Sequence, residues 1–117
     1  MEKGIIYVCS TAVDGLIKIG RTKNFEARIK TLEDNGYRNV AGLKRQFAIE
    51  VENHEEIEQL LHDLFDKSRV GNTELFSLDL DKIIQLLSSL SGKQVYPKNE
   101  TKQDIFEKVA TPKFRLY

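Results

Sequence analysis

The sequence predicts a small α+β domain in which an antiparallel three-stranded sheet is flanked by helices. Short segments rich in β-branched and aromatic residues alternate with segments whose apolar residues recur every three or four positions, as expected for strands interleaved with amphipathic helices. The chain has 117 residues, which is the length of a single domain. It has one cysteine, so it cannot form an internal disulfide. It is 40% hydrophobic and 31% charged, which is typical of a globular chain rather than a disordered one.

The first two strands are expected to form a hairpin. Residues 4–10 (GIIYVCS) are β-branched and aromatic, and residues 16–21 (LIKIGR) alternate between apolar and other side chains. The pair Asp14-Gly15 between them is a common turn signal. The short separation predicts that the two strands pair antiparallel.

Two helices and a third strand are expected next. Asn24 is a suitable N-cap for a helix that runs to about Asn35, and the third strand is clearest over residues 46–51. Asn53 and Glu56 have the spacing of a capping box at the start of a second helix, which is expected to end near residue 68. The apolar stripe expected on this helix consists of Ile57, Leu60, Leu61, Leu64 and Phe65.

The remaining chain divides at Lys93. Residues 73–78 are expected to be extended, and Asp79 caps a last helix that closes by Gly92. From Lys93 onward the sequence is polar and loses its periodicity, so residues 1–92 are expected to be the folded domain and residues 93–117 a polar tail or a linker. No apolar run approaches the roughly 18–20 residues that cross a membrane, and the start lacks a long apolar signal region, so a cytoplasmic location is expected.

The charged residues are balanced in number but unevenly placed along the chain. Residues 16–46 hold eight basic and three acidic residues, whereas residues 48–82 hold ten acidic and three basic ones. A basic segment of this kind is compatible with a phosphate-binding face. Mutual neutralisation of the two halves within the fold explains the same pattern, and charge alone favours neither reading.

Two short motifs and the helices after them carry a family resemblance. The first strand contains GIIY at residues 4–7, and the second contains KIGRT at residues 18–22. Arg28 follows on the first helix and Glu58 on the second. In these residues and their order the chain resembles the GIY-YIG endonuclease superfamily, and in particular its phage and bacterial branch with a K-I-G-x-T second motif.

The resemblance implies a role for each matched residue. Tyr7 matches the tyrosine of the first motif, a general base or water-orienting group, and Lys18 stands where the second motif usually has tyrosine. Arg28 matches the arginine that contacts the scissile phosphate, and Glu58 matches the glutamate that holds one divalent cation, Mg²⁺ or Mn²⁺. The late asparagine of the family has no clear counterpart; that region holds Asn72 and Glu74.

Residues around the second motif are expected to bind the DNA backbone. Gly20 permits a close approach of a phosphate or of another backbone segment. Arg21 and Lys23 supply positive charge beside it, and Thr22 supplies a hydroxyl group. DNA is therefore the expected partner.

The proposed chemistry accounts for these residue types. Phosphodiester hydrolysis builds negative charge on the phosphate oxygens, which suits an arginine, and on the leaving oxygen, which suits a hard cation held by one or two carboxylates. Tyrosine is a weak base at neutral pH because its ordinary pKa is about 10. His62 lies one helical turn after Glu58, so it is a second candidate for the base or for a ligand of the same metal.

Three functions are consistent with the sequence. The leading hypothesis is a metal-dependent endonuclease domain that hydrolyses DNA phosphodiester bonds. The loss of the second tyrosine favours an alternative, a catalytically weak or inert nucleic-acid-binding module on the same fold. The acidic helix at residues 53–68 suggests a third, a protein-interaction domain.

Overall fold

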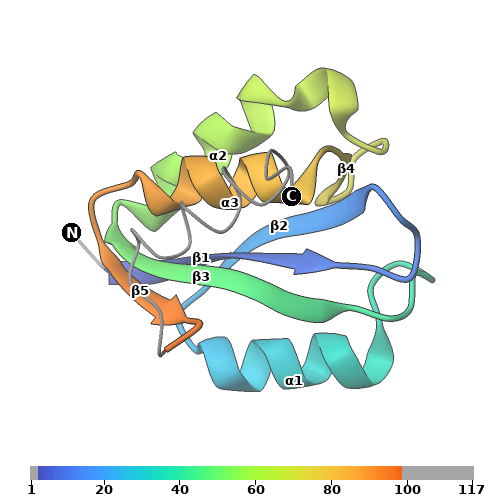
Figure 1. Cartoon of the computed structure of the whole chain (residues 1–117), viewed down its shortest axis with the longest axis horizontal. Helices are drawn as coiled ribbons and strands as arrows, with labels where there is room; N and C mark the ends of the chain where they lie inside the picture. The colour runs from blue at the N-terminus through green and yellow to red at the C-terminus, as the bar shows by residue number, and fades with distance from the viewer. Residues whose placement is uncertain (1–2, 99–117) are drawn as a thin grey trace, which may run out of the picture.

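A computed structural model describes residues 3–98, which form a five-stranded antiparallel sheet flanked by three helices (Figure 1). The predicted α+β class is therefore confirmed. The strands lie in the order β4-β2-β1-β3-β5. The elements are β1 (Lys3–Ser10), β2 (Leu16–Thr22), α1 (Phe25–Asn35), β3 (Lys44–Glu52), α2 (His54–Leu64), the 3₁₀ helix η1 (Asp66–Ser68), β4 (Leu75–Ser77), α3 (Leu80–Ser88) and β5 (Lys93–Tyr96).

The sheet has two more strands than the three that the sequence predicts. β4 is the extended piece expected at residues 73–78, and its three residues pair with β2. β5 lies at the start of the expected polar tail and pairs with β3 along one edge of the sheet. Four residues are too few to show an alternating pattern, so this strand was missed. The rest of the expected tail, from residue 99, lies outside the described residues.

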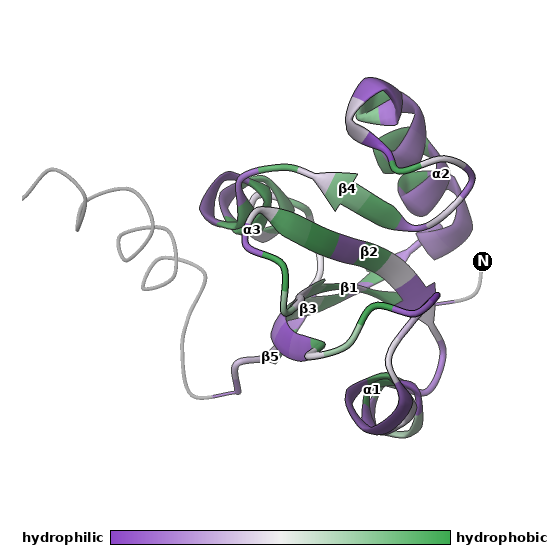
Figure 2. Cartoon of the chain, turned by 90° about the vertical axis from the view of Figure 1, so that its right-hand side faces the viewer, coloured by the Kyte–Doolittle hydropathy of each residue, from purple (hydrophilic) through white to green (hydrophobic). Residues whose placement is uncertain are grey.

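Helices cover both faces of the sheet. α1 packs on one face, and α2 and α3 pack on the other (Figures 1 and 2). Because successive strand residues point to opposite faces, Ile6 and Val8 belong to the core under α2 and α3, while Tyr7 and Cys9 belong to the core over α1. None of the helices in residues 3–98 is long and apolar enough to span a lipid bilayer.

All three helices start where the sequence predicts, and two of the three predicted caps are confirmed. The Asn24 side chain accepts a hydrogen bond from the Ala27 N–H, and the Asp79 side chain accepts from the N–H groups of Asp81 and Lys82. These side chains satisfy backbone donors that have no partner within the first helical turn.

The predicted capping box at the start of α2 is wrong. Asn53 has left-handed backbone angles (φ 61°, ψ 37°), and its side chain makes no capping hydrogen bond. Asn53 is the single residue between β3 and α2, so it must reverse the direction of the chain by itself. Asparagine adopts this conformation more readily than most other residues, but the geometry removes its side chain from the cap.

The predicted apolar stripe of α2 is only partly correct. Leu60 and Leu64 have 67% and 69% of their surface exposed, whereas Leu61 is buried. Two histidines of the same helix, His54 and His62, are buried instead. The helix is therefore rotated about its axis from the orientation that its leucines alone predict, and it ends at Leu64 rather than near residue 68.

Contacts of the two buried histidines with the sheet accompany this rotation. His62 Nε2 lies 3.2 Å from the carbonyl oxygen of Ile19 in β2 and donates to it. The His54 ring packs against Gly4 of β1 so closely that a Cβ atom at Gly4 would overlap it. Both ends of α2 are thus held by imidazole rings, and the position of the whole helix over β1 and β2 follows from them.

Neighbouring leucines of α2 should respond differently to the same substitution. We expect Leu61→Ala to lower the free energy of unfolding by about 2–5 kcal/mol, because it leaves a cavity in the core. Leu60→Ala should change it by less than about 0.5 kcal/mol, because its side chain is already in solvent. Chemical denaturation measures both, and equal losses would contradict the observed rotation of the helix.

Candidate functional site

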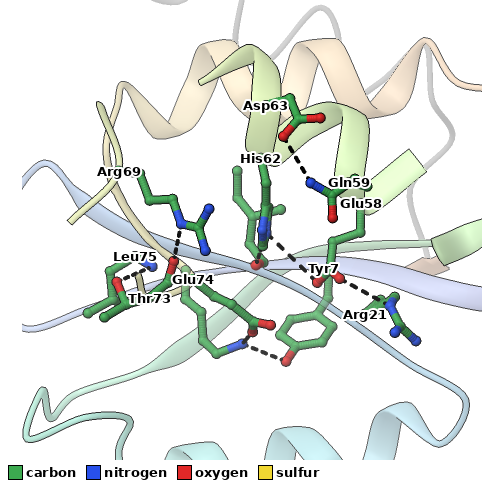
Figure 3. Close-up of polar contacts among 12 residues, drawn as sticks. Tyr7, Arg21, Glu58, Gln59, His62, Asp63, Arg69, Thr73, Glu74 and Leu75 are labelled. Carbon is green, nitrogen blue, oxygen red and sulfur yellow. Dashed lines mark hydrogen bonds and ion pairs between the residues drawn. The ribbon is translucent and has the colours of Figure 1, made fainter. Parts of the chain in front are cut away.

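The candidate site lies at the start of β4, where β2 continues beyond its pairing with that strand. β4 pairs with β2 only over Leu16–Lys18, and one further backbone bond joins the Ile19 N–H to the Glu74 carbonyl at 3.0 Å. Residues 20–22 of β2 pair with β1 on one side only among the described strands. Polar side chains from both faces of the sheet reach this edge (Figure 3).

A buried lysine occupies the α1 side of the edge. Lys18 is fully buried, and its Nζ donates to Tyr7 Oη at 2.8 Å and to Glu74 Oε1 at 2.6 Å. Gly20 makes this arrangement possible, because a Cβ atom there would lie about 2.5 Å from Tyr7 Oη and 2.6 Å from Lys18 Nζ. The close approach expected at Gly20 is therefore made by these two side chains.

The environment of Lys18 keeps it charged. Burial by itself would lower the pKa of Lys18, but its interactions with Tyr7 and Glu74 outweigh burial and raise that pKa above the ordinary lysine value. An ammonium group has only donors, so the Tyr7 oxygen must accept from it. The O–H of Tyr7 is then directed away from Lys18.

A second tyrosine, which the sequence did not single out, completes this side. The Tyr37 ring centroid lies 4.8 Å from Lys18 Nζ, the same distance as the Tyr7 centroid. The Tyr37 hydroxyl accepts a hydrogen bond of 3.1 Å from the backbone N–H of Glu74. Lys18 thus contacts two aromatic rings, and Tyr37 also fixes the segment that carries the partner carboxylate.

A partly satisfied carboxylate occupies the α2 side. Glu58 has 12% of its side chain exposed, and its Oε1 accepts from Arg21 Nε at 3.1 Å. Its Oε2 is buried and has no hydrogen-bond partner within residues 3–98. Burial and the neighbouring Glu74 carboxylate raise the pKa of Glu58, while His62, Arg21 and Lys18 oppose the shift. The Glu74 carboxylate thus acts on Glu58 electrostatically, in the direction that favours the protonated form.

His62 supports the backbone of this edge. Its Nε2 donates to the Ile19 carbonyl and lies 3.8 Å from Glu58 Oε2, and its ring packs against Phe76 at 5.1 Å. The proton on Nε2 is therefore committed to a backbone oxygen, which favours a positioning role. Catalysis by His62 stays a prediction. The described residues contain no group of three or more His, Cys, Asp or Glu side chains arranged to hold a metal.

Arg28 lies on α1, the helix that covers the Tyr7 face of the sheet. Glu26 and Glu33, on one flank of the helix, bind Arg45 of β3 at 3.2 and 2.9 Å. By helical geometry Arg28 lies on the opposite flank of α1, and it is half-buried. Within residues 3–98 its guanidinium has no hydrogen-bond or ion-pair partner.

The remaining motif residues form the connection from β2 to α1. The Thr22 hydroxyl donates to the Asn24 carbonyl and accepts from the Asn24 N–H, so it shapes the turn before the helix. Lys23 is exposed in the same turn. Arg21 pairs with Glu58 and lies 4.0 Å from Glu55. DNA binding by these residues and by Gly20 stays a prediction.

Comparison with known families shows which family the chain belongs to. A family model, the T5orf172 domain, matches residues 4–91. The chain belongs to the T5orf172 domain family. This phage-associated, nucleic-acid-related family is distinct from the GIY-YIG endonuclease superfamily, so the assignment made from the two motifs is wrong. No curated protein and no solved structure matches the chain.

Because this T5orf172 domain lies outside the GIY-YIG superfamily, the motifs of that superfamily no longer support its candidate site. The roles of Tyr7, Lys18, Arg28 and Glu58 were inferred from the superfamily motifs, and they now depend on geometry alone. That geometry brings Tyr7, Lys18 and Glu58 to one edge of the sheet, and Arg28 lies on the helix that covers one face of that sheet.

The stability of a Glu58→Gln variant should depend on pH. Because folding raises the pKa of Glu58 above 4.5, the folded state binds this proton more tightly than the unfolded chain, and wild-type stability falls as Glu58 ionises. Relative to wild type, Glu58→Gln should therefore gain stability as the pH rises from about 4 to about 7.

Chemical denaturation at a series of pH values measures this difference. Glu55→Gln is the matched control, because it removes one acidic charge from an exposed position of the same helix. A difference between Glu58→Gln and wild type that moves in the opposite direction, or stays constant, would contradict the burial of this carboxyl.

Proposed function

We propose that this chain is a metal-dependent nuclease domain that hydrolyses DNA phosphodiester bonds at the open edge of β2. The observation that carries the proposal is the convergence of Tyr7, Lys18 and Glu74 from one face of the sheet with Glu58 from the other. Membership of a nucleic-acid-related family supports the substrate class. Residues 20–22 of β2 have no further strand beside them within residues 3–98, which leaves room for an extended substrate to approach these groups.

Arg28 is the cation best suited to bind the reacting phosphate. Lys18 forms an ion pair with Glu74, and Arg21 forms one with Glu58. Arg28 has no carboxylate partner in residues 3–98. Guanidinium groups bind phosphate oxygens through two parallel hydrogen bonds, and they stabilise the negative charge that grows during hydrolysis. Its half-buried position makes that interaction stronger than one in open solvent.

In this proposal Tyr7, whose side chain is buried at the site, orients the attacking water. Its oxygen accepts from Lys18, which fixes the phenol ring and leaves the O–H for a water molecule or a phosphate oxygen. Lys18 is therefore a positioning residue in this proposal, and Glu74 and Tyr37 hold Lys18 in turn.

One observation fits a divalent cation at Glu58. Its Oε2 is buried without a hydrogen-bond partner among the described residues, and Glu74 repels its charge. A cation held by Glu58 would supply the missing partner and offset this repulsion, and Mg²⁺ is commonly bound by one or two carboxylates together with water. When bound, such an ion stabilises negative charge on the leaving oxygen.

A nucleic-acid-binding module without catalysis is the second candidate. The specific observation in its favour is that Arg21 already neutralises one oxygen of Glu58 at 3.1 Å. A carboxylate held in this way binds a cation less readily. Salt-dependent DNA binding without cleavage would select this candidate.

Plasmid cleavage in the presence of Mg²⁺ or Mn²⁺ tests the nuclease proposal. We expect Arg28→Gln and Glu58→Gln each to lower the cleavage rate by about 100- to 1,000-fold, the usual effect of removing one group that stabilises transition-state charge. Lys30→Gln is the control, because Lys30 is an exposed residue of α1 that pairs with Asp34.

Two outcomes would contradict the nuclease proposal. One is the absence of cleavage by wild-type protein with either metal. The other is cleavage that survives in both Arg28→Gln and Glu58→Gln at the rate of the Lys30→Gln control.

A further inference from the structure

The turn after α1 has an unusual backbone. The Tyr37 N–H donates to the Val40 carbonyl at 2.9 Å and the Val40 N–H donates to the Tyr37 carbonyl at 2.8 Å, which closes a two-residue turn. Both central residues, Arg38 (φ 50°) and Asn39 (φ 65°), are in the left-handed region. Such turns favour Asn-Gly, because arginine adopts this conformation only at a cost in free energy. The sequence therefore retains an unfavourable residue at Arg38.

The same turn is attached to the candidate site. The Tyr37 ring centroid lies 4.8 Å from Lys18 Nζ and 5.8 Å from the Arg38 guanidinium carbon, so one ring contacts both cations. The Tyr37 hydroxyl accepts from the Glu74 N–H. Arg38 is thus positioned by the residue that also positions the buried lysine and its carboxylate.

Arg38 is also available to a ligand. It is exposed, and within residues 3–98 it has no carboxylate partner, unlike Arg21, Arg45 and Arg69. A surface arginine that served only solubility would not need left-handed backbone angles, since an Asn-Gly turn would have the same shape at lower free energy. Backbone strain that persists beside a candidate site is a reason to look for a function.

We propose that Arg38 binds a backbone phosphate of the nucleic-acid strand whose reacting phosphate lies at the edge formed by residues 20–22 of β2. The identity of the ligand rests on the proposed function. The Arg38 guanidinium offers the bidentate geometry that phosphates accept, and the Tyr37 ring against it restricts its positions before binding. Tyr37 separates Arg38 from Lys18, so Arg38 contributes to affinity and to the placement of the strand rather than to the chemical step.

DNA affinity measured as a function of salt tests this proposal. Fluorescence anisotropy with a labelled duplex, in EDTA to prevent cleavage, is compared for wild type, Arg38→Gln and the control Lys30→Gln. We expect weaker binding by Arg38→Gln and a slope of log affinity against log salt that is shallower by about 0.9, the value for one lost phosphate contact. Identical affinity and slope in Arg38→Gln and Lys30→Gln would overturn the proposal.

A glycine variant separates the role in binding from the role in folding. Arg38→Gly removes the guanidinium and relieves the backbone, so we expect a higher midpoint of thermal unfolding together with the weak binding of Arg38→Gln. Arg38→Lys should recover part of the affinity, because it restores the charge without the bidentate geometry. Wild-type affinity in Arg38→Gly, or a lower unfolding midpoint, would contradict the proposal.

The two proposals fail in distinguishable ways. Wild-type protein that binds no duplex DNA at low salt would contradict both the proposed function and the role of Arg38. Wild-type protein that binds DNA, with affinity unchanged in all three Arg38 variants, would contradict the role of Arg38 alone.

Discussion

The burial of the Lys18 ammonium group is the constraint on which the rest of this site depends. A buried charge without partners would destabilise the fold by several kcal/mol, so the chain must supply compensating groups. Tyr7 from β1 and Glu74 from the segment before β4 accept its hydrogen bonds, and the Tyr37 ring lies against it. Gly20 leaves the space that these groups occupy. Compensation of one charge thus brings together four segments that are distant in the sequence.

Beyond β4, the backbone polar groups of Ile19 in β2 are hydrogen-bonded by Glu74 and His62 rather than by a further strand. β4 begins only at Leu75, and beyond it Ile19 donates its N–H to the Glu74 carbonyl and accepts at its own carbonyl from His62. These two contacts satisfy its polar groups without extending the sheet, so residues 20–22 have no strand beyond them in the described part of the chain. The short β4 therefore stabilises the sheet and also creates the opening at which Glu58 and Glu74 interact.

Local sequence patterns predicted those parts of the fold that depend on local interactions. The hairpin and the caps at Asn24 and Asp79 follow from neighbouring residues and are confirmed. The rotation of α2 was not predictable in this way, because it depends on hydrogen bonding of His62 to a distant carbonyl. The pairing of β5 also depends on a distant strand.

The site was predicted in part, for the same reason. Its motifs indicated Tyr7, Lys18 and Glu58, but four or five residues were too few to identify the family, which the match over residues 4–91 decides. Glu74 and Tyr37 have no motif, although a lysine within an apolar strand was itself a signal that an acidic partner exists. The most direct test of the account is ¹⁵N-detected NMR of the Lys18 side chain in the whole chain. The account predicts a slowly exchanging ammonium signal, with nuclear Overhauser contacts to the rings of Tyr7 and Tyr37, that is still mostly protonated at pH 10.5. A signal that exchanges as fast as those of exposed lysines, without contacts to either ring, would contradict it.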